Sequence, residues 1–240
     1  MGARVESLGW SPVKGTTWHQ EHSLDLTIDG VPGDRLWSPI TPDLTCVKAT
    51  DVPQLAGVRV EVENLPSEGQ ALFDGAEQTI RYYDRTFPGL VFDGAVAQRL
   101  SEAAGRQLLL ARTSASRGFI WSSPVSVLLR SELDGLPTDT GRYRPNVVID
   151  DRDAPLLLAP GELVLVGEAV LQVERELDRC LVINHDPLTG RKDANLLKHL
   201  RTGALLGFGC RVVSPGRISV SDDCARVVGR AGLEPATQGL

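Results

Sequence analysis

The stretch ELVLVGEAVLQVERELDRCLVINHDPLTG, residues 162–190, carries the pattern that decides the fold. Valine and leucine alternate with other residues over 162–176, which is the two-residue period of a β-strand. A second apolar run, CLVIN at 180–184, predicts another strand, and an Asp-Pro-Leu-Thr-Gly turn follows it. Because such runs recur along the chain, we expect a β-rich protein.

The rest of the chain extends this pattern. Seven further runs predict strands, at residues 4–8, 23–28, 58–63, 89–94, 106–111, 146–150 and 211–220. Three segments predict helices, at 95–104, 124–133 and 193–200, and Gly105 is a suitable residue to end the first. Many strands with few helices indicate a β-rich α+β protein built on a barrel or closed sheet. Residues 229–240 lack periodicity and predict a disordered tail.

The overall composition excludes some classes of function. The chain has 240 residues, a net charge of −6 and a pI near 5.3. An acidic protein lacks the broad basic face that nucleic-acid binding requires, so we expect no nucleic-acid partner. No signal-peptide core and no apolar run of about 20 residues is visible, so we expect no membrane partner and a cytoplasmic location.

The four cysteines, at 46, 180, 210 and 224, include no C-x-x-C pair, so free thiols are expected in a reducing cytoplasm. Cys180 has two interpretations. A free cysteine is often a buried strand residue, whereas the adjacent guanidinium of Arg179 favours the thiolate, a soft metal ligand. A zinc site of Cys180, His185, His199 and Cys210 lacks paired ligand spacing and is disfavoured.

Three cations are held by rigid or turn residues, as anion ligands often are. Lys14 follows a Pro-Val step, Arg35 follows a Gly-Asp turn, and Arg144 precedes a proline that starts a strand. Arginine forks and a lysine point charge suit a phosphate, although each cation alone could be structural. Ser122 and Ser123 precede the expected helix at 124–133, whose N-terminus would also attract an anion, unless they are plain capping residues.

Together these segments resemble a known family. RYRPNVVID (142–150), ELDRCLVINHDPLTG (176–190) and FGCRVVSPGRISVSDD (208–223) look like the molybdenum cofactor sulfurase C-terminal domain, the MOSC domain. VESLGWSPVKG (5–15) and LTIDGVPGDRLW (26–37) resemble the N-terminal β-barrel domain of the mitochondrial amidoxime-reducing enzymes and their bacterial relatives. The resemblance implies a MOSC-type β-barrel at 91–228, preceded by a smaller β-barrel-like domain at 1–90.

The resemblance also implies a site. Cys180 would bind the molybdenum of the molybdenum cofactor (molybdopterin). Its pterin and phosphate would be held by Lys14, Arg35, Ser122, Ser123, Arg144, Asn146, Asp178 and Arg179. The chain departs from the family pattern at three places: Gly15 and Asp178 each stand where the family usually has serine, and Ser221 stands in the closing Val-Gly-Asp turn.

Three functions remain open at this point. The first is an oxidoreductase that reduces N-hydroxylated small molecules with electrons from a separate reductase or ferredoxin-type protein, because the sequence shows no flavin, haem or iron–sulfur motif. The second is a carrier of the cofactor, or of sulfur as a persulfide on Cys180. The third is a family member that keeps the fold and binds nothing. A complete sulfurase is not expected, since no pyridoxal-phosphate domain is apparent.

Overall fold

A computed structural model of the protein describes residues 2–115, 117–200 and 204–227. Its strands are β1 (Ala3–Trp10), β2 (His19–Glu21), β3 (Ser23–Leu26), β4 (Trp37–Ile40), β5 (Gln78–Tyr82), β6 (Arg85–Phe92), β7 (Leu109–Thr113), β8 (Val125–Leu129), β9 (Val147–Asp150), β10 (Leu163–Val166), β11 (Ala169–Asp178), β12 (Leu205–Ser214), β13 (Gly216–Ser219) and β14 (Asp223–Val227). Among the described residues the only α-helix is α1 (Ala95–Ala104). No helix in these ranges is long and apolar enough to span a membrane. The expected tail at 229–240 lies outside them.

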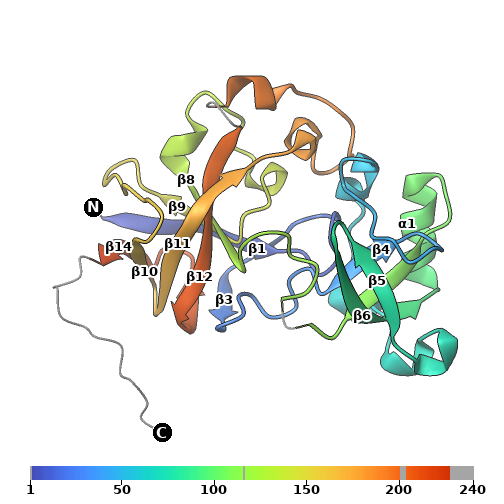
Figure 1. Ribbon diagram of the computed structural model, residues 1–240. Coiled ribbons are helices and arrows are strands. Elements are labelled where there is room, and N and C mark those ends of the chain that lie inside the picture. Colours follow the sequence, from blue (N-terminus) through green and yellow to red (C-terminus); the bar gives the residue numbers. More distant parts are fainter. Residues whose placement is uncertain (1, 116, 201–203, 228–240) are drawn as a thin grey trace, which may run out of the picture.

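Seven strands close into a barrel, in the order β14-β10-β11-β12-β8-β9-β1, and β1 pairs again with β14 (Figure 1). All neighbours are antiparallel except β8 and β9, which run parallel. Alternate residues such as Val164, Val166 and Leu171 point inward and are fully buried in one hydrophobic core. This closed sheet confirms the β-rich, barrel-type fold expected from the sequence.

A second sheet, β4-β7-β6-β5, lies beside the barrel, and α1 packs near it (Figure 1). The expected boundary at 90/91 falls inside β6, which pairs with β5 before it and β7 after it. In addition, the N-terminal strand β1 belongs to the barrel, between β9 and β14. Residues from the first 90 positions therefore contribute to both sheets.

Single-turn 3-10 helices occupy the connections: η1 (Pro53–Gly57), η2 (Val62–Asn64), η3 (Glu68–Gln70), η4 (Phe73–Gly75), η5 (Arg130–Leu133), η6 (Thr140–Arg142), η7 (Leu181–Asn184) and η8 (Leu196–His199). Four sequence predictions are wrong here. The helix expected at 124–133 is strand β8 followed by η5, and the helix expected at 193–200 is only η8. The strands expected at 58–63 and 180–184 are absent, and η2 and η7 lie there instead.

These differences have physical reasons. In β8, Val125, Val127 and Leu129 alternate into the barrel core, and burying β-branched residues there outweighs the helix-start pattern of Ser123 and Pro124. After β11 the chain leaves the barrel, so the apolar residues of η7 have no strand partner. Ile183 packs instead into a separate hydrophobic cluster outside the barrel.

Candidate functional site

Cys180 lies where β11 ends and η7 begins, at the end of the barrel wall. Of the four cysteines, all of which the structure describes, Cys180 alone is exposed. Burial raises the pKa of Cys46 to about 11 and those of Cys210 and Cys224 to about 12, so these three stay protonated thiols. The interpretation of Cys180 as a buried strand residue is therefore wrong, and its sulfur is open to a ligand.

The segment after Cys180 is held on both sides. The guanidinium of Arg142 donates to the carbonyl of Ile183 at 3.2 Å and forms a two-pronged ion pair with Asp193 at 2.7 and 2.8 Å. The side chain of Asn184 accepts the backbone N–H of Leu196 at 2.6 Å. The cysteine therefore sits on a fixed turn rather than on a free loop.

The turn at residues 186–190 fixes the other end of this segment. Asp186 Oδ1 accepts the backbone N–H of Thr189 at 2.7 Å and its hydroxyl at 2.8 Å, and these bonds hold the pKa of Asp186 below its usual range. Gly190 has φ +66, and a Cβ there would come within 2.5 Å of Gln54 Cα. Only glycine allows this close approach, which anchors the cysteine segment against η1.

A cavity of about 180 Å³ opens beside Cys180. Six of the predicted site residues line it: Lys14, Arg35, Arg144, Asp178, Arg179 and Cys180. They come from four distant parts of the chain, namely the loop after β1, the turn before β4, the segment before β9 and the end of β11. The structure thus brings four cations and one exposed thiol together.

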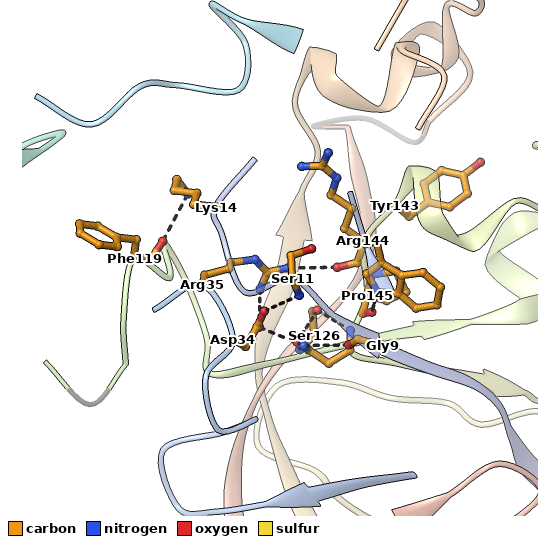
Figure 2. Close-up of polar contacts among 12 residues, drawn as sticks. Gly9, Ser11, Lys14, Asp34, Arg35, Phe119, Ser126, Tyr143, Arg144 and Pro145 are labelled. Atoms are coloured by element: carbon orange, nitrogen blue, oxygen red, sulfur yellow. Dashed lines mark hydrogen bonds and ion pairs between the residues drawn. The ribbon is translucent and has the colours of Figure 1, made fainter. Parts of the chain in front are cut away.

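Arg35 is fixed by a buried network around Asp34 (Figure 2). Asp34 Oδ2 pairs with Arg35 Nη1 at 2.9 Å and accepts Asn146 Nδ2 at 3.0 Å, while its Oδ1 accepts the backbone N–H of Ser11 at 3.1 Å. Arg35 Nη2 also donates to the carbonyl of Arg144 at 3.2 Å. The two cation-bearing segments are therefore locked to each other through hydrogen bonds.

Arg144 extends this connection to the N-terminal loop. Its Nη2 donates to the carbonyl of Gly15 at 3.1 Å, next to Lys14. Arg35 and Arg144 both have left-handed backbones, with φ of +50 and +51, which non-glycine residues adopt at a cost. Strained backbones of this kind persist where the surrounding contacts hold them in place, and they are concentrated at functional sites.

Arg179 reaches back under the barrel end. Its Nε donates to the carbonyl of Leu206 at 2.8 Å and its Nη1 to the carbonyl of Tyr143 at 2.9 Å. Its Nη2 is buried and has no hydrogen-bond partner among the described residues. A buried guanidinium nitrogen without a partner is costly, and an anion in the adjoining cavity would satisfy it.

The cationic side chains that line the cavity repel one another, and they are partly shielded from water. Burial, and then the charges of Arg35 and Arg144, lower the pKa of Lys14 to about 8. Burial is also the largest cause lowering the pKa values of Arg144 and Arg179 to about 10, and the charge of Arg35 adds to it in both cases. A bound anion would reverse these shifts, because an opposite charge favours the protonated form of each group.

Three predicted residues do not line the cavity. Ser122 is exposed and Ser123 is buried against Gly209, and neither caps a helix because β8 is a strand. Asn146 is buried, and its side chain bonds Ser126, Gly9 and Asp34. Asn146 therefore positions Arg35 through Asp34.

One charged lining residue, Arg142, is not predicted from the sequence. Arg142 is buried and holds η7, yet in GRYRPN it is one of two arginines, and only Arg144 precedes the proline. Its partner Asp193 is 51 positions away, so no local pattern marks the pair. Within the described ranges, no group of three His, Cys, Asp or Glu side chains is placed to hold a metal ion.

Residues 119–225 match the family model of the MOSC domain. This part of the chain is therefore similar to the MOSC domain. The matched range spans β8 to the middle of β14 and includes Arg144, Arg179 and Cys180. Lys14 and Arg35 lie outside it, so the cavity combines residues of the matched range with residues from the N-terminal part of the chain.

The chain is also similar to solved structures. YuaD from Bacillus subtilis is 16% identical over 93% of this chain and 94% of that one, with a TM-score of 0.46. YiiM from Geobacillus stearothermophilus is 17% identical over 44% of this chain and 55% of that one, with a TM-score of 0.33. YiiM from Escherichia coli is 19% identical over 45% of this chain and 56% of that one, with a TM-score of 0.32. No curated protein matches the chain.

Proposed function

We propose that this protein binds the molybdenum cofactor and reduces N-hydroxylated small molecules, with Cys180 as the protein ligand of the metal. The observation that carries the proposal is the exposed thiol of Cys180 beside five cationic side chains in one cavity, the four predicted ones and Arg142. Members of the MOSC family are associated with this cofactor, and the matched range includes the cysteine. A soft thiolate suits a soft metal centre, and a cluster of cations suits a phosphate.

The residues present fit the proposed group on structural grounds. Arg179 Nη2 is buried without a partner among the described residues, and burial, followed by the charges of Arg35 and Arg144, disfavours the protonated form of Lys14 and lowers its pKa. Both features would be relieved by an anion of the size of a phosphate. Lys14, Arg35, Arg144 and Arg179 would hold the phosphate and pterin, and Cys180 would bind the metal.

The two departures from the family pattern that lie at the cavity, Gly15 and Asp178, have different consequences. Gly15 has φ +85, a backbone that favours glycine, and its carbonyl orients Arg144, so this substitution suits the local structure. Asp178 is exposed at the cavity wall, where its carboxylate opposes an anionic ligand and weakens its binding. The cations around it outnumber this single negative charge.

When bound, the cofactor would supply two-electron redox chemistry. The net reaction consumes two electrons and two protons, breaks one N–O bond and releases water, so that R–NH–OH becomes R–NH₂. The chain's own residues would hold the cofactor next to Cys180. The cationic side chains would neutralise the negative charge of the cofactor, and the Asp34 network would fix the orientation of Arg35 toward it. The electrons would come from a separate reductase or a ferredoxin-type protein.

A second candidate is a carrier that delivers the cofactor, or sulfur held as a persulfide on Cys180. The exposure of Cys180 favours this function equally, because a carrier must present its sulfur to an acceptor. The two functions differ in turnover. Only the oxidoreductase reduces a substrate catalytically, whereas a sulfur carrier gains the mass of one sulfur atom at Cys180.

The experiment is reduction of benzamidoxime with a chemically reduced viologen as electron donor, using protein from a host that makes the cofactor. We expect turnover by the wild-type protein, background rates for Cys180→Ala, and wild-type rates for Cys224→Ala, which removes a buried thiol that does not line the cavity. Absence of turnover with cofactor bound, together with a persulfide on Cys180, would favour the carrier.

A further inference from the structure

The hairpin between β5 and β6 ends in an unusual residue. Tyr82 pairs with Arg85, so Tyr83 and Asp84 form a two-residue loop. Tyr83 has φ +55 and Asp84 does not have a positive φ, as in a type II′ turn, whose first position is normally glycine. A tyrosine at this position is strained, whereas glycine would not be.

The side chain of Tyr83 completes an exposed aromatic pair. Its ring lies 4.3 Å from that of Trp121, centroid to centroid, and 4.9 Å from that of Tyr82. Tyr83 remains 47% exposed and Trp121 53% exposed, although large aromatic residues usually bury most of their surface. Trp121 is held in place by Arg85, whose guanidinium lies 5.1 Å from its ring and donates to its carbonyl at 3.3 Å.

The aromatic pair adjoins the cavity through shared neighbours. Lys14, which lines the cavity, places its Nζ 5.0 Å from the ring of Tyr82 and donates to the carbonyl of Phe119 at 3.3 Å (Figure 2). Lys48 lies 5.2 Å from the ring of Tyr83, and the next residue, Ala49, lines the cavity. The negative charge of a Cys180 thiolate is among the causes that raise the pKa of Tyr83, after burial.

We propose that Tyr83 and Trp121 form a stacking surface beside the cavity, which selects flat, aromatic N-hydroxylated substrates. This inference rests on the proposed function. The two rings are tilted 49° to each other, and about half of each side chain stays open to a planar ligand. Stacking on such rings tolerates different ring systems. Because Lys14, Lys48 and Arg85 lie against the cluster, neutral or anionic ligands are favoured over cationic ones.

The test compares binding of benzamidoxime, which is flat and aromatic, with acetamidoxime, which has no ring. Dissociation constants are measured by equilibrium dialysis of the cofactor-loaded protein without an electron donor. Tyr83→Gly removes the ring and also relieves the strained backbone. We expect roughly ten-fold weaker binding of benzamidoxime, unchanged binding of acetamidoxime, and no loss of thermal stability.

Phe73→Gly is the matched control. Phe73 is 50% exposed with φ +56, but it lies in η4 and its ring is not among those that contact Tyr83 or Trp121. This variant should bind both ligands as the wild-type protein does. Equal loss of both ligands in Tyr83→Gly, or loss of neither, would overturn the proposal. So would normal binding combined with slower electron delivery by a protein donor, since the surface would then serve a protein partner.

Molybdenum content, measured on the same samples, separates this proposal from the one on which it rests. A wild-type protein without molybdenum refutes the proposed function, whatever the dialysis shows. A protein that holds molybdenum and reduces both amidoximes, but whose Tyr83→Gly variant shows no selective loss, refutes only the stacking surface.

Discussion

Replacing Asp34 with alanine tests whether the buried network around this carboxylate holds the site together. The side chain of Asp34 is fully buried, and it neutralises Arg35, which is only 19% exposed. Removing it also leaves Asn146 Nδ2 without its bond to Asp34 and the backbone N–H of Ser11 without an acceptor. Breaking a buried ion pair from one side costs about 3–5 kcal/mol, and the partial exposure of Arg35 places Asp34→Ala near 3 kcal/mol.

The assay is urea unfolding followed by circular dichroism and tryptophan fluorescence, with coincident transitions required for a two-state treatment. Asp25→Ala is the control, because the ion pair of Asp25 with Arg217 is exposed on both sides and should contribute less than about 1 kcal/mol. A loss below about 1 kcal/mol in Asp34→Ala would refute the reasoning, since the network would then contribute no more than a surface pair.

Three further outcomes are expected. The pKa of Lys14 falls from 10.5 to about 8 on folding, so between these pH values the unfolded chain binds more protons than the folded protein. The ligand-free protein should therefore become more stable as pH rises from about 8 to 10.5. Thermal unfolding measured across this pH range should show that Lys14→Met lacks this gain in stability. Gly15→Ser should lower stability by about 1 kcal/mol in urea unfolding, because φ +85 disfavours a side chain. Iodoacetamide should label Cys180 before the three buried cysteines, as read by peptide mass spectrometry, and labelling of a buried cysteine first would contradict the assigned exposure.

The barrel was predictable from the sequence because its strands alternate. Val164 and Val166 point into the core while Leu165 points outward, and that period is visible in the residues themselves. β8 was missed because Ser123 and Pro124 match a helix start, although Val125 and Val127 already alternate in the same segment. The capping pattern favours a helix here, whereas burial of Val125 and Val127 in the barrel core favours a strand. A single sequence does not show which residues are buried, so it does not decide between the two.

The site was predictable in residue type but not in its connections. Cys180, Lys14 and the arginines have the chemistry of a cofactor pocket, and the structure places them together. The bond from Arg35 to the carbonyl of Arg144 joins residues 109 positions apart, so no spacing rule predicts it. The motif shared with Arg144 predicts a cofactor contact for Asn146, whereas Asn146, just before β9, is buried and donates to Asp34.

The most direct test of the central claim is the molybdenum and pterin content of the purified protein, made in a host that synthesises the cofactor. We predict near-stoichiometric molybdenum in the wild-type protein, loss of the metal in Cys180→Ala, and partial retention of pterin through Lys14, Arg35 and Arg144. A folded wild-type protein that contains neither molybdenum nor pterin would contradict the claim, and Cys180 would then be an exposed thiol without a ligand.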